Sequence, residues 1–127
     1  MDNTLALCIP AYNASDYLPR LLESAERQTV TFDEILVYDD CSTDETAKVA
    51  RSYGATVISG NENQGPSVGR KRLAEHASAD WVHFHDSDDE LLPNFVECAQ
   101  EWMNSDEPPD VVLFGFEHRR YEDGELI

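Results

Sequence analysis

Positive charge is scarce in this sequence. Nine Lys and Arg residues stand against 26 Asp and Glu residues, which gives a formal net charge of −17 over 127 residues, and only two of the nine are lysines. Because such a surface repels phosphate backbones and anionic membranes, the composition argues against binding nucleic acid or lipid through a basic face. It does not exclude small phosphorylated ligands, which one arginine or a bound cation can capture. The acidity also suits a protein from a high-salt cell, and composition alone leaves that open.

Long apolar runs and paired cysteines are missing as well. No run reaches the roughly 18 apolar residues that a membrane-spanning helix needs, and the first ten residues have no basic region of a secretory signal. The three cysteines, Cys8, Cys41 and Cys98, have unrelated spacings and fit reduced, buried thiols better than disulfides or a zinc site. We therefore expect a cytoplasmic protein. A hydrophobic content of 41% suffices for a core, and the length predicts one domain or part of one.

Short apolar runs alternate with amphipathic stretches along the chain. The predicted strands are residues 5–9, 34–38, 56–59, 81–85 and 110–116, and the predicted helices are residues 15–28, 42–53, 67–77 and 93–103. Strands that alternate with helices at this spacing indicate an α/β fold, with a mostly parallel sheet covered by helices on both faces.

Local signals set the expected ends of these elements. Pro10 is expected to stop the first strand. Ser15 or Asp16 is expected to cap the first helix, and Ser42 or Thr43 the second. Residues 121–125 are expected to form a hairpin turn.

Polar clusters follow each of the first four predicted strands. They are residues 10–13, 39–44, 60–67 and 86–90. Parallel α/β sheets bind ligands at the carboxyl ends of their strands, where loops and helix amino termini gather. Four clusters on one edge therefore predict a ligand site there.

The cluster after the fourth strand holds four carboxylates in five residues: Asp86, Asp88, Asp89 and Glu90. Their mutual repulsion is relieved by a divalent cation with hard oxygen ligands, Mg²⁺ or Mn²⁺, which would bring phosphate oxygens as further ligands. An isolated Asp-X-Asp is more often a solvated turn, but the neighbouring clusters favour a metal site. An EF-hand is excluded because Leu91 stands where that loop needs glycine. Haloacid-dehalogenase phosphatases and response-regulator receivers carry their paired acids after the first strand, so both fit poorly.

Five segments in order resemble the GT-A glycosyltransferases, and within them glycosyltransferase family 2. The segments are IPAYN at 9–13, YDDCSTD at 38–44, NQG at 63–65 followed by GR at 69–70, DSDD at 86–89 and LPNF at 92–95. The resemblance covers residues 5 to about 103. It implies a Rossmann-like nucleotide-diphospho-sugar transferase fold, truncated at its C-terminal side. Residues 1–127 would form a single domain, the N-terminal donor-binding part, with the acceptor-binding part absent.

The resemblance also implies roles for the residues around a nucleotide base. Pro10, Ala11 and Tyr12 would lie beside the base, although Tyr12 is equally well explained as a packed aromatic. Asp40 would accept a hydrogen bond from the base edge, uracil being the expected base, and Asp39 would bond loop amides. Cys41 stands where the family usually has Gly or Asn.

The remaining implied roles concern the diphosphate and the metal. Gly65 would let backbone approach the nucleotide, and Arg70 would face the diphosphate. Asp86 and Asp88 would form the DxD element, with Asp88 as the direct ligand of Mn²⁺ or Mg²⁺ and Asp89 as a second candidate. The donor would be a nucleotide-diphosphate sugar, a UDP-sugar by preference.

The resemblance implies an inverting transfer to an acceptor hydroxyl on a glycan, lipid or protein, helped by a carboxylate general base. That base normally comes from a further segment, so we expect it beyond residue 127 and expect this chain alone to be inactive. His83 and His85 are better explained as core or strand-end histidines than as a replacement base. A full-length protein peripheral to the inner membrane face and a homodimer both remain open.

Two other functions compete with a transferase. A sugar-nucleotide pyrophosphorylase would carry a Gly-rich, basic loop after the first strand, which residues 10–13 lack. A non-catalytic binding module would keep the fold without turnover.

Overall fold

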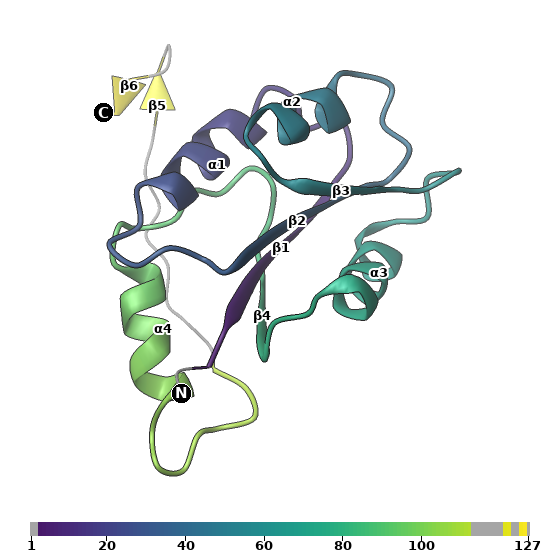
Figure 1. Cartoon of the computed structure of the whole chain (residues 1–127). Helices are drawn as coiled ribbons and strands as arrows, with labels where there is room; N and C mark the ends of the chain where they lie inside the picture. Colours follow the sequence, from purple (N-terminus) through teal and green to yellow (C-terminus); the bar gives the residue numbers. More distant parts are fainter. Residues whose placement is uncertain (1–2, 113–120, 123–124, 127) are drawn as a thin grey trace.

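The computed structural model describes residues 3–112, 121–122 and 125–126. In chain order the elements are β1 (Leu5–Ala11), α1 (Leu18–Glu26), β2 (Glu34–Asp39), α2 (Thr46–Ser52), β3 (Thr56–Ser59), α3 (Pro66–His76), β4 (Trp81–Phe84), α4 (Phe95–Met103), β5 (Tyr121–Glu122) and β6 (Glu125–Leu126) (Figure 1). The predicted α/β alternation is confirmed. Among the described residues, no helix is long and apolar enough to cross a bilayer.

Four strands form one parallel sheet in the order β3-β2-β1-β4. β1 lies at its centre, with Ile9 opposite Val37 of β2 and Cys8 opposite Phe84 of β4. The carboxyl ends of all four strands therefore meet at one edge. β5 and β6 pair antiparallel, which confirms the hairpin expected over 121–125.

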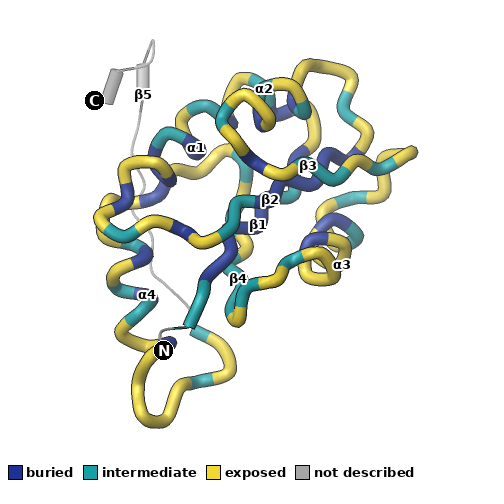
Figure 2. Tube along the Cα trace, viewed as in Figure 1, coloured by how far each residue is buried: buried dark blue, intermediate teal, exposed yellow. Residues whose placement is uncertain are grey.

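The side chains of β1 alternate between two cores, one on each face of the sheet. Leu7 and Ile9 are fully buried in the larger core, which they share with the apolar stripe of α1 and with residues of α2 and α4. Ala6 and Cys8 point to the smaller core, which Leu73 of α3 closes. Figure 2 shows the buried trace running through β1 and β2, with the exposed residues on the outer sides of the helices. The prediction of helices on both faces is confirmed.

Helix α3 packs unusually close to the strand ends. A Cβ built at Gly69 would lie 3.2 Å from Cβ of Pro10 and 3.2 Å from Cδ1 of Tyr38. Because glycine has no side chain there, α3 can rest directly on β1 and β2. This contact brings the helix that carries Arg70 to the functional edge of the sheet.

The prediction that Pro10 ends the first strand is wrong, since β1 runs on to Ala11. Backbone groups alternate sides along a strand, and the carbonyl of Cys8 accepts from the His85 amide of the β4 side. Pro10 therefore faces the same side, where pairing with β4 has already ended at Cys8. Its missing N–H costs no ladder hydrogen bond.

Three further expectations need correction. The helix caps are Tyr17 for α1 and Glu45 for α2, and neither makes a side-chain capping bond. Residues 110–112 of the fifth predicted strand are not in a strand, and 113–116 lie outside the described residues. All three cysteines are free, but only Cys8 is buried; burial, and then Glu34, raise the pKa of Cys8 to about 12, whereas Cys41 is exposed.

Candidate functional site

The loops that follow β1 and β2 are joined by hydrogen bonds at the carboxyl edge of the sheet. The backbone N–H of Asn13 donates to Oγ of Ser42 at 2.9 Å, and Oδ1 of Asn13 accepts from the Thr43 amide at 2.8 Å. Asn13 has a positive φ of 48°, a conformation that asparagine tolerates. The two loops thus form one rigid unit rather than independent turns.

Asp44 is the second link between these loops, and sequence reasoning missed it. Its carboxylate accepts from the hydroxyl of Ser15 at 2.8 Å and from the Thr46 amide at 3.0 Å, and it also bonds the Thr46 hydroxyl. The slight burial of Asp44 would raise its pKa, but the hydrogen bonds from Thr46 and Ser15 outweigh it and lower the pKa to about 2. Ser15 is therefore engaged across the loops and does not cap α1.

Asp40 lies buried at the end of β2 and holds the loop that leads into α3. Its two carboxylate oxygens accept from the backbone N–H groups of Gln64 and Gly65, both at 2.9 Å, and its own N–H donates to the Ala11 carbonyl at 2.9 Å. Asp39 bonds one loop amide, that of Ser42, at 3.0 Å. The sequence predicted loop amides for Asp39 alone. A carboxylate oxygen has more than one acceptor position, so both acids keep capacity for a ligand.

Backbone conformations near this edge match the residues that occupy it. Gly65, the N-terminal boundary of α3, has φ 89° and ψ 167°, a region that is essentially restricted to glycine. Cys41 has φ 62°, a left-handed conformation that glycine and asparagine adopt more readily than cysteine.

The other predicted nucleotide-binding residues differ in exposure. Tyr12 is 48% exposed and Arg70 is exposed on α3, where it makes no ion pair within 4 Å among the described residues. Pro10 is half-buried against α3. Ala11 is 3% exposed and belongs to the larger core, so only its backbone can reach a ligand.

Asp86, Asp88 and Asp89 form an exposed acidic trio directly after β4. Each offers a carboxylate oxygen within 4.8 Å of the others, which is close enough for one cation to bind all three. The His85 amide bonds the Cys8 carbonyl at 3.0 Å and so fixes the start of this segment beside β1. Carboxylates alone, in an exposed turn, suit a hard divalent cation such as Mg²⁺ or Mn²⁺. The grouping expected from the sequence is present.

His83 and His85 form a mostly buried pair at the base of this segment. Nε2 of His83 lies 2.9 Å from Nδ1 of His85, and the His83 ring packs on Phe95 with centroids 4.4 Å apart. Burial, and then His85, lower the pKa of His83 to about 4; burial also lowers the pKa of His85, although Asp89 and Asp86 oppose this. Both imidazoles are therefore neutral near pH 7, and a pKa of about 4 makes His83 a weak proton acceptor.

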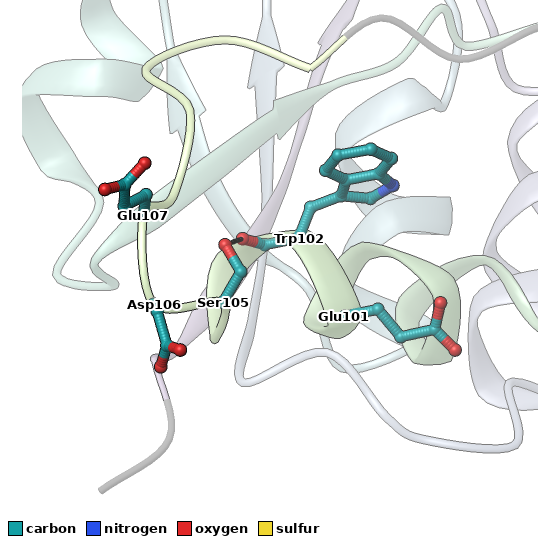
Figure 3. A pocket seen from close by; sticks show the side chains of 5 residues that line it. All are labelled: Glu101, Trp102, Ser105, Asp106 and Glu107. Carbon is teal, nitrogen blue, oxygen red and sulfur yellow. Dashed lines mark hydrogen bonds between the residues drawn. The ribbon is translucent and has the colours of Figure 1, made fainter.

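Two hollows on the described part of the chain differ in their relation to the trio. The larger, about 690 Å³, lies at the end of α4 and is lined by Glu101, Trp102, Ser105, Asp106 and Glu107. Figure 3 shows that these side chains point apart and converge on no common centre. Asn3, just before β1, bonds the Met103 carbonyl, so this hollow lies near the start of β1, away from the loops described above.

The smaller hollow, of about 380 Å³, adjoins the acidic trio. It is lined by Asp16, Tyr17, Pro19, Arg20 and Glu23 around α1, and by Asp88. Despite its size, it is the more informative of the two because it shares Asp88 with the trio. The sequence pattern gave no signal for the α1 residues in it.

Comparison with known sequences identifies one family. Residues 6–126 match the family described as Glycosyl transferase family 2. A glycosyltransferase of uncharacterised specificity from Haemophilus influenzae is 38% identical over 95 residues, which are 73% of this chain and 32% of that protein. The chain spans about a third of the length of such relatives.

Solved structures agree in fold. TarS of S. aureus, solved with UDP-GlcNAc, superposes with a TM-score of 0.75 at 29% identity over 80% of this chain and 31% of TarS. Glucosyl-3-phosphoglycerate synthase from Mycobacterium tuberculosis, solved with Mn²⁺ and UDP, gives 0.61 at 26% identity over 69% of this chain and 36% of that enzyme. With a parallel GT-A-type sheet, loops joined at its carboxyl edge and a three-aspartate cluster after β4, the chain belongs to glycosyl transferase family 2.

Proposed function

We propose that this chain is the donor-binding part of a glycosyltransferase and binds a nucleotide-diphosphate sugar, preferably a UDP-sugar, together with Mn²⁺ or Mg²⁺. The observation that carries the proposal is the acidic trio, three exposed carboxylates within 4.8 Å of one another at the strand end next to β1. The solved relatives that contain UDP, UDP-GlcNAc or Mn²⁺ support the choice of ligands.

The trio would hold the cation, with Asp88 as a direct ligand and Asp86 and Asp89 beside it. When bound, the cation offsets the negative charge that develops on the diphosphate leaving group. Arg70 adds a charge-assisted contact to the same diphosphate, since its guanidinium is exposed and not engaged by a described carboxylate. This local positive charge is what an otherwise strongly acidic surface needs to accept a phosphorylated ligand.

The nucleoside would lie over the carboxyl ends of β1 and β2. Tyr12 offers an exposed ring on which a base can stack, and Pro10 forms the adjoining wall. Asp40, with Asp39 beside it, would accept a hydrogen bond from the base edge, while Gly65 leaves room for close approach of the backbone. Ala11 would contribute backbone only.

In the transfer, an acceptor hydroxyl attacks the anomeric carbon as the bond to the diphosphate breaks, and the proton of the hydroxyl passes to a general base. Attack opposite the leaving group inverts that carbon. We propose that the base and the acceptor-binding surface are not supplied by residues 1–127, so that this chain alone binds donor without transferring the sugar. Glycosyl transfer by the isolated chain would contradict this part of the proposal.

Calorimetric titration with UDP, in Mn²⁺ and in EDTA, tests the donor site. We expect tighter binding in Mn²⁺ and expect Asp88→Ala to abolish that difference. Asp106→Ala is the matched control, because Asp106 is equally exposed but lies at the end of α4. Equal UDP binding with and without Mn²⁺ in the wild type would refute the metal-dependent site.

The same titration separates the competing functions. Tight binding of a nucleoside triphosphate with pyrophosphate exchange would instead indicate a pyrophosphorylase. Absence of binding by any nucleotide would indicate a module that keeps the fold alone.

A further inference from the structure

We propose that Ser24 of α1 and Gln28, just past the end of that helix, are positioning residues for the acidic trio. They hold the loop of residues 91–93, which follows the trio after Glu90, and thereby set the affinity of the trio for a divalent cation. The inference rests on the proposed function, since it takes the trio as the cation site.

Ser24 contacts the loop through its hydroxyl group. The residue is 8% exposed; its Oγ–H donates to the Leu21 carbonyl at 2.6 Å, and its Oγ accepts from the Leu91 amide at 2.9 Å. Leu91 is only two residues beyond Asp89. One buried hydroxyl therefore ties the helix backbone to the end of the acidic segment.

Gln28, one turn further along and just past the end of α1, makes a second set of bonds. It is 6% exposed; its Nε2 donates to the Leu92 carbonyl at 2.7 Å and to the Ser24 carbonyl at 3.2 Å. Its Oε1 accepts from the Val96 amide at 3.1 Å, in the first turn of α4. The next residue, Thr29, donates its N–H to the Pro93 carbonyl at 2.8 Å. Every residue of the 91–93 loop thus bonds to α1 or to the two residues that follow Arg27.

Burying two polar side chains beside a helix lowers the folding stability unless their hydrogen bonds are made. Leu18, Leu21, Leu22 and Ala25 fill the rest of the buried face of α1 with apolar groups. Ser24 and Gln28 are the exceptions there, and both serve the same three-residue loop. An apolar pair would fill the space but would leave the Leu91 and Val96 amides without the side-chain oxygens that they bond.

The trio needs such support because its three carboxylates repel one another. The segment is held on its N-terminal side by the bond from the His85 amide to Cys8 and on its C-terminal side by Ser24 and Gln28. Fixing both ends keeps the carboxylates close in spite of the repulsion, so less conformational freedom is lost when a cation binds. The hollow between Asp88 and the start of α1 shows that the same helix also runs alongside the trio.

Titration of the 127-residue chain with Mn²⁺, followed by loss of the free Mn²⁺ signal in electron paramagnetic resonance, tests the inference. We expect Ser24→Ala and Gln28→Leu each to weaken Mn²⁺ binding by about tenfold, as removal of groups that orient metal ligands commonly does. Ser24→Thr keeps the hydroxyl and should retain most of the wild-type affinity.

Ser52→Ala is the matched control. It removes a 2.6 Å hydrogen bond from the Ser52 hydroxyl to the Val49 carbonyl at the end of α2 without touching the loop, so it should leave Mn²⁺ affinity unchanged. The unfolding midpoint of each variant is measured alongside. A role limited to stability would lower the midpoint of Ser24→Ala and leave its Mn²⁺ affinity at the wild-type value.

Hydrogen exchange at the Leu91 amide should become faster in Ser24→Ala, which would prove that the bond was lost. If the Mn²⁺ affinity of that variant still equals the wild-type value, the inference is overturned. If Gln28→Leu does not fold, Ser24→Ala and its Thr counterpart decide the matter alone. Failure of the proposed function looks different, because the wild type itself would then bind no Mn²⁺ at the trio; that result overturns both.

Discussion

The paired imidazoles of His83 and His85 give the chain a measurable response to pH. Burial, and then His85, hold the pKa of His83 at about 4, below its ordinary value of 6.5. As the pH falls below 6.5, the unfolded chain takes up a proton on this residue before the folded chain does. The free energy of unfolding therefore decreases from pH 6.5 to about pH 4 and loses no more to this group below that.

We predict that His83→Phe, which keeps an aromatic ring against Phe95, makes this decrease shallower. Urea unfolding at several pH values between 7 and 4 measures it. His76→Gln is the control, since His76 is exposed on α3 and its replacement should preserve the wild-type slope. Parallel pH profiles for His83→Phe and the wild type would show that His83 has no part in the acid response.

At the scale of elements, the start of α3 depends on one backbone conformation. Gly65 adopts φ 89° and ψ 167°, and its N–H donates to Asp40. A Cβ at this position meets no atom within 4 Å, so the cost of Gly65→Ala is conformational, about 1–3 kcal/mol of unfolding free energy. We also expect weaker UDP binding, because the loop must shift away from Asp40.

Gly54→Ala separates the two effects. Gly54 has a similar φ of 84° and equally open surroundings, but it follows α2. It should lose stability while keeping the wild-type UDP affinity, as measured by urea unfolding and calorimetry. Equal UDP affinities in the two alanine variants would remove the loop at Gly65 from the nucleotide site.

The helices and strands differ in how well the sequence predicted their positions and ends. The first four strands and the apolar stripe of α1 were predicted well because their periodicity is local. The caps were missed because Ser15 and Ser42 bond Asp44 and Asn13, about thirty residues away, in preference to their own helices. Pro10 was misjudged because its tolerance depends on where the neighbouring strand ends.

The candidate site was foreseen in the same uneven way. The acidic trio could be predicted because its carboxylates are adjacent in sequence. The two amides that bond Asp40, and the bonds from Ser24 and Gln28 to the 91–93 loop, join segments 24 to 67 residues apart. No local pattern encodes such contacts.

At the scale of the whole molecule, the positions of a few residues would allow a chain with a net charge of −17 to bind the proposed anionic ligand. Most of the acidic side chains lie on the surface. The trio places three of them close enough for one cation to offset their local negative charge. Arg70 lies on α3, on the other face of the sheet from α1, and its helix reaches the same edge through Gly69. We therefore propose that cation and nucleotide bind together at the carboxyl edge of the sheet.

Nuclear magnetic resonance of the ¹⁵N-labelled chain with Mn²⁺ and UDP tests that claim most directly. Paramagnetic Mn²⁺ should broaden the amide signals of residues 86–89 first, and UDP should shift those of Tyr12, Asp40 and Gly65 and strengthen the broadening at 86–89. Broadening centred on the acids at the end of α4, Glu101 to Glu107, or UDP shifts that avoid the β1 and β2 loops would contradict the account.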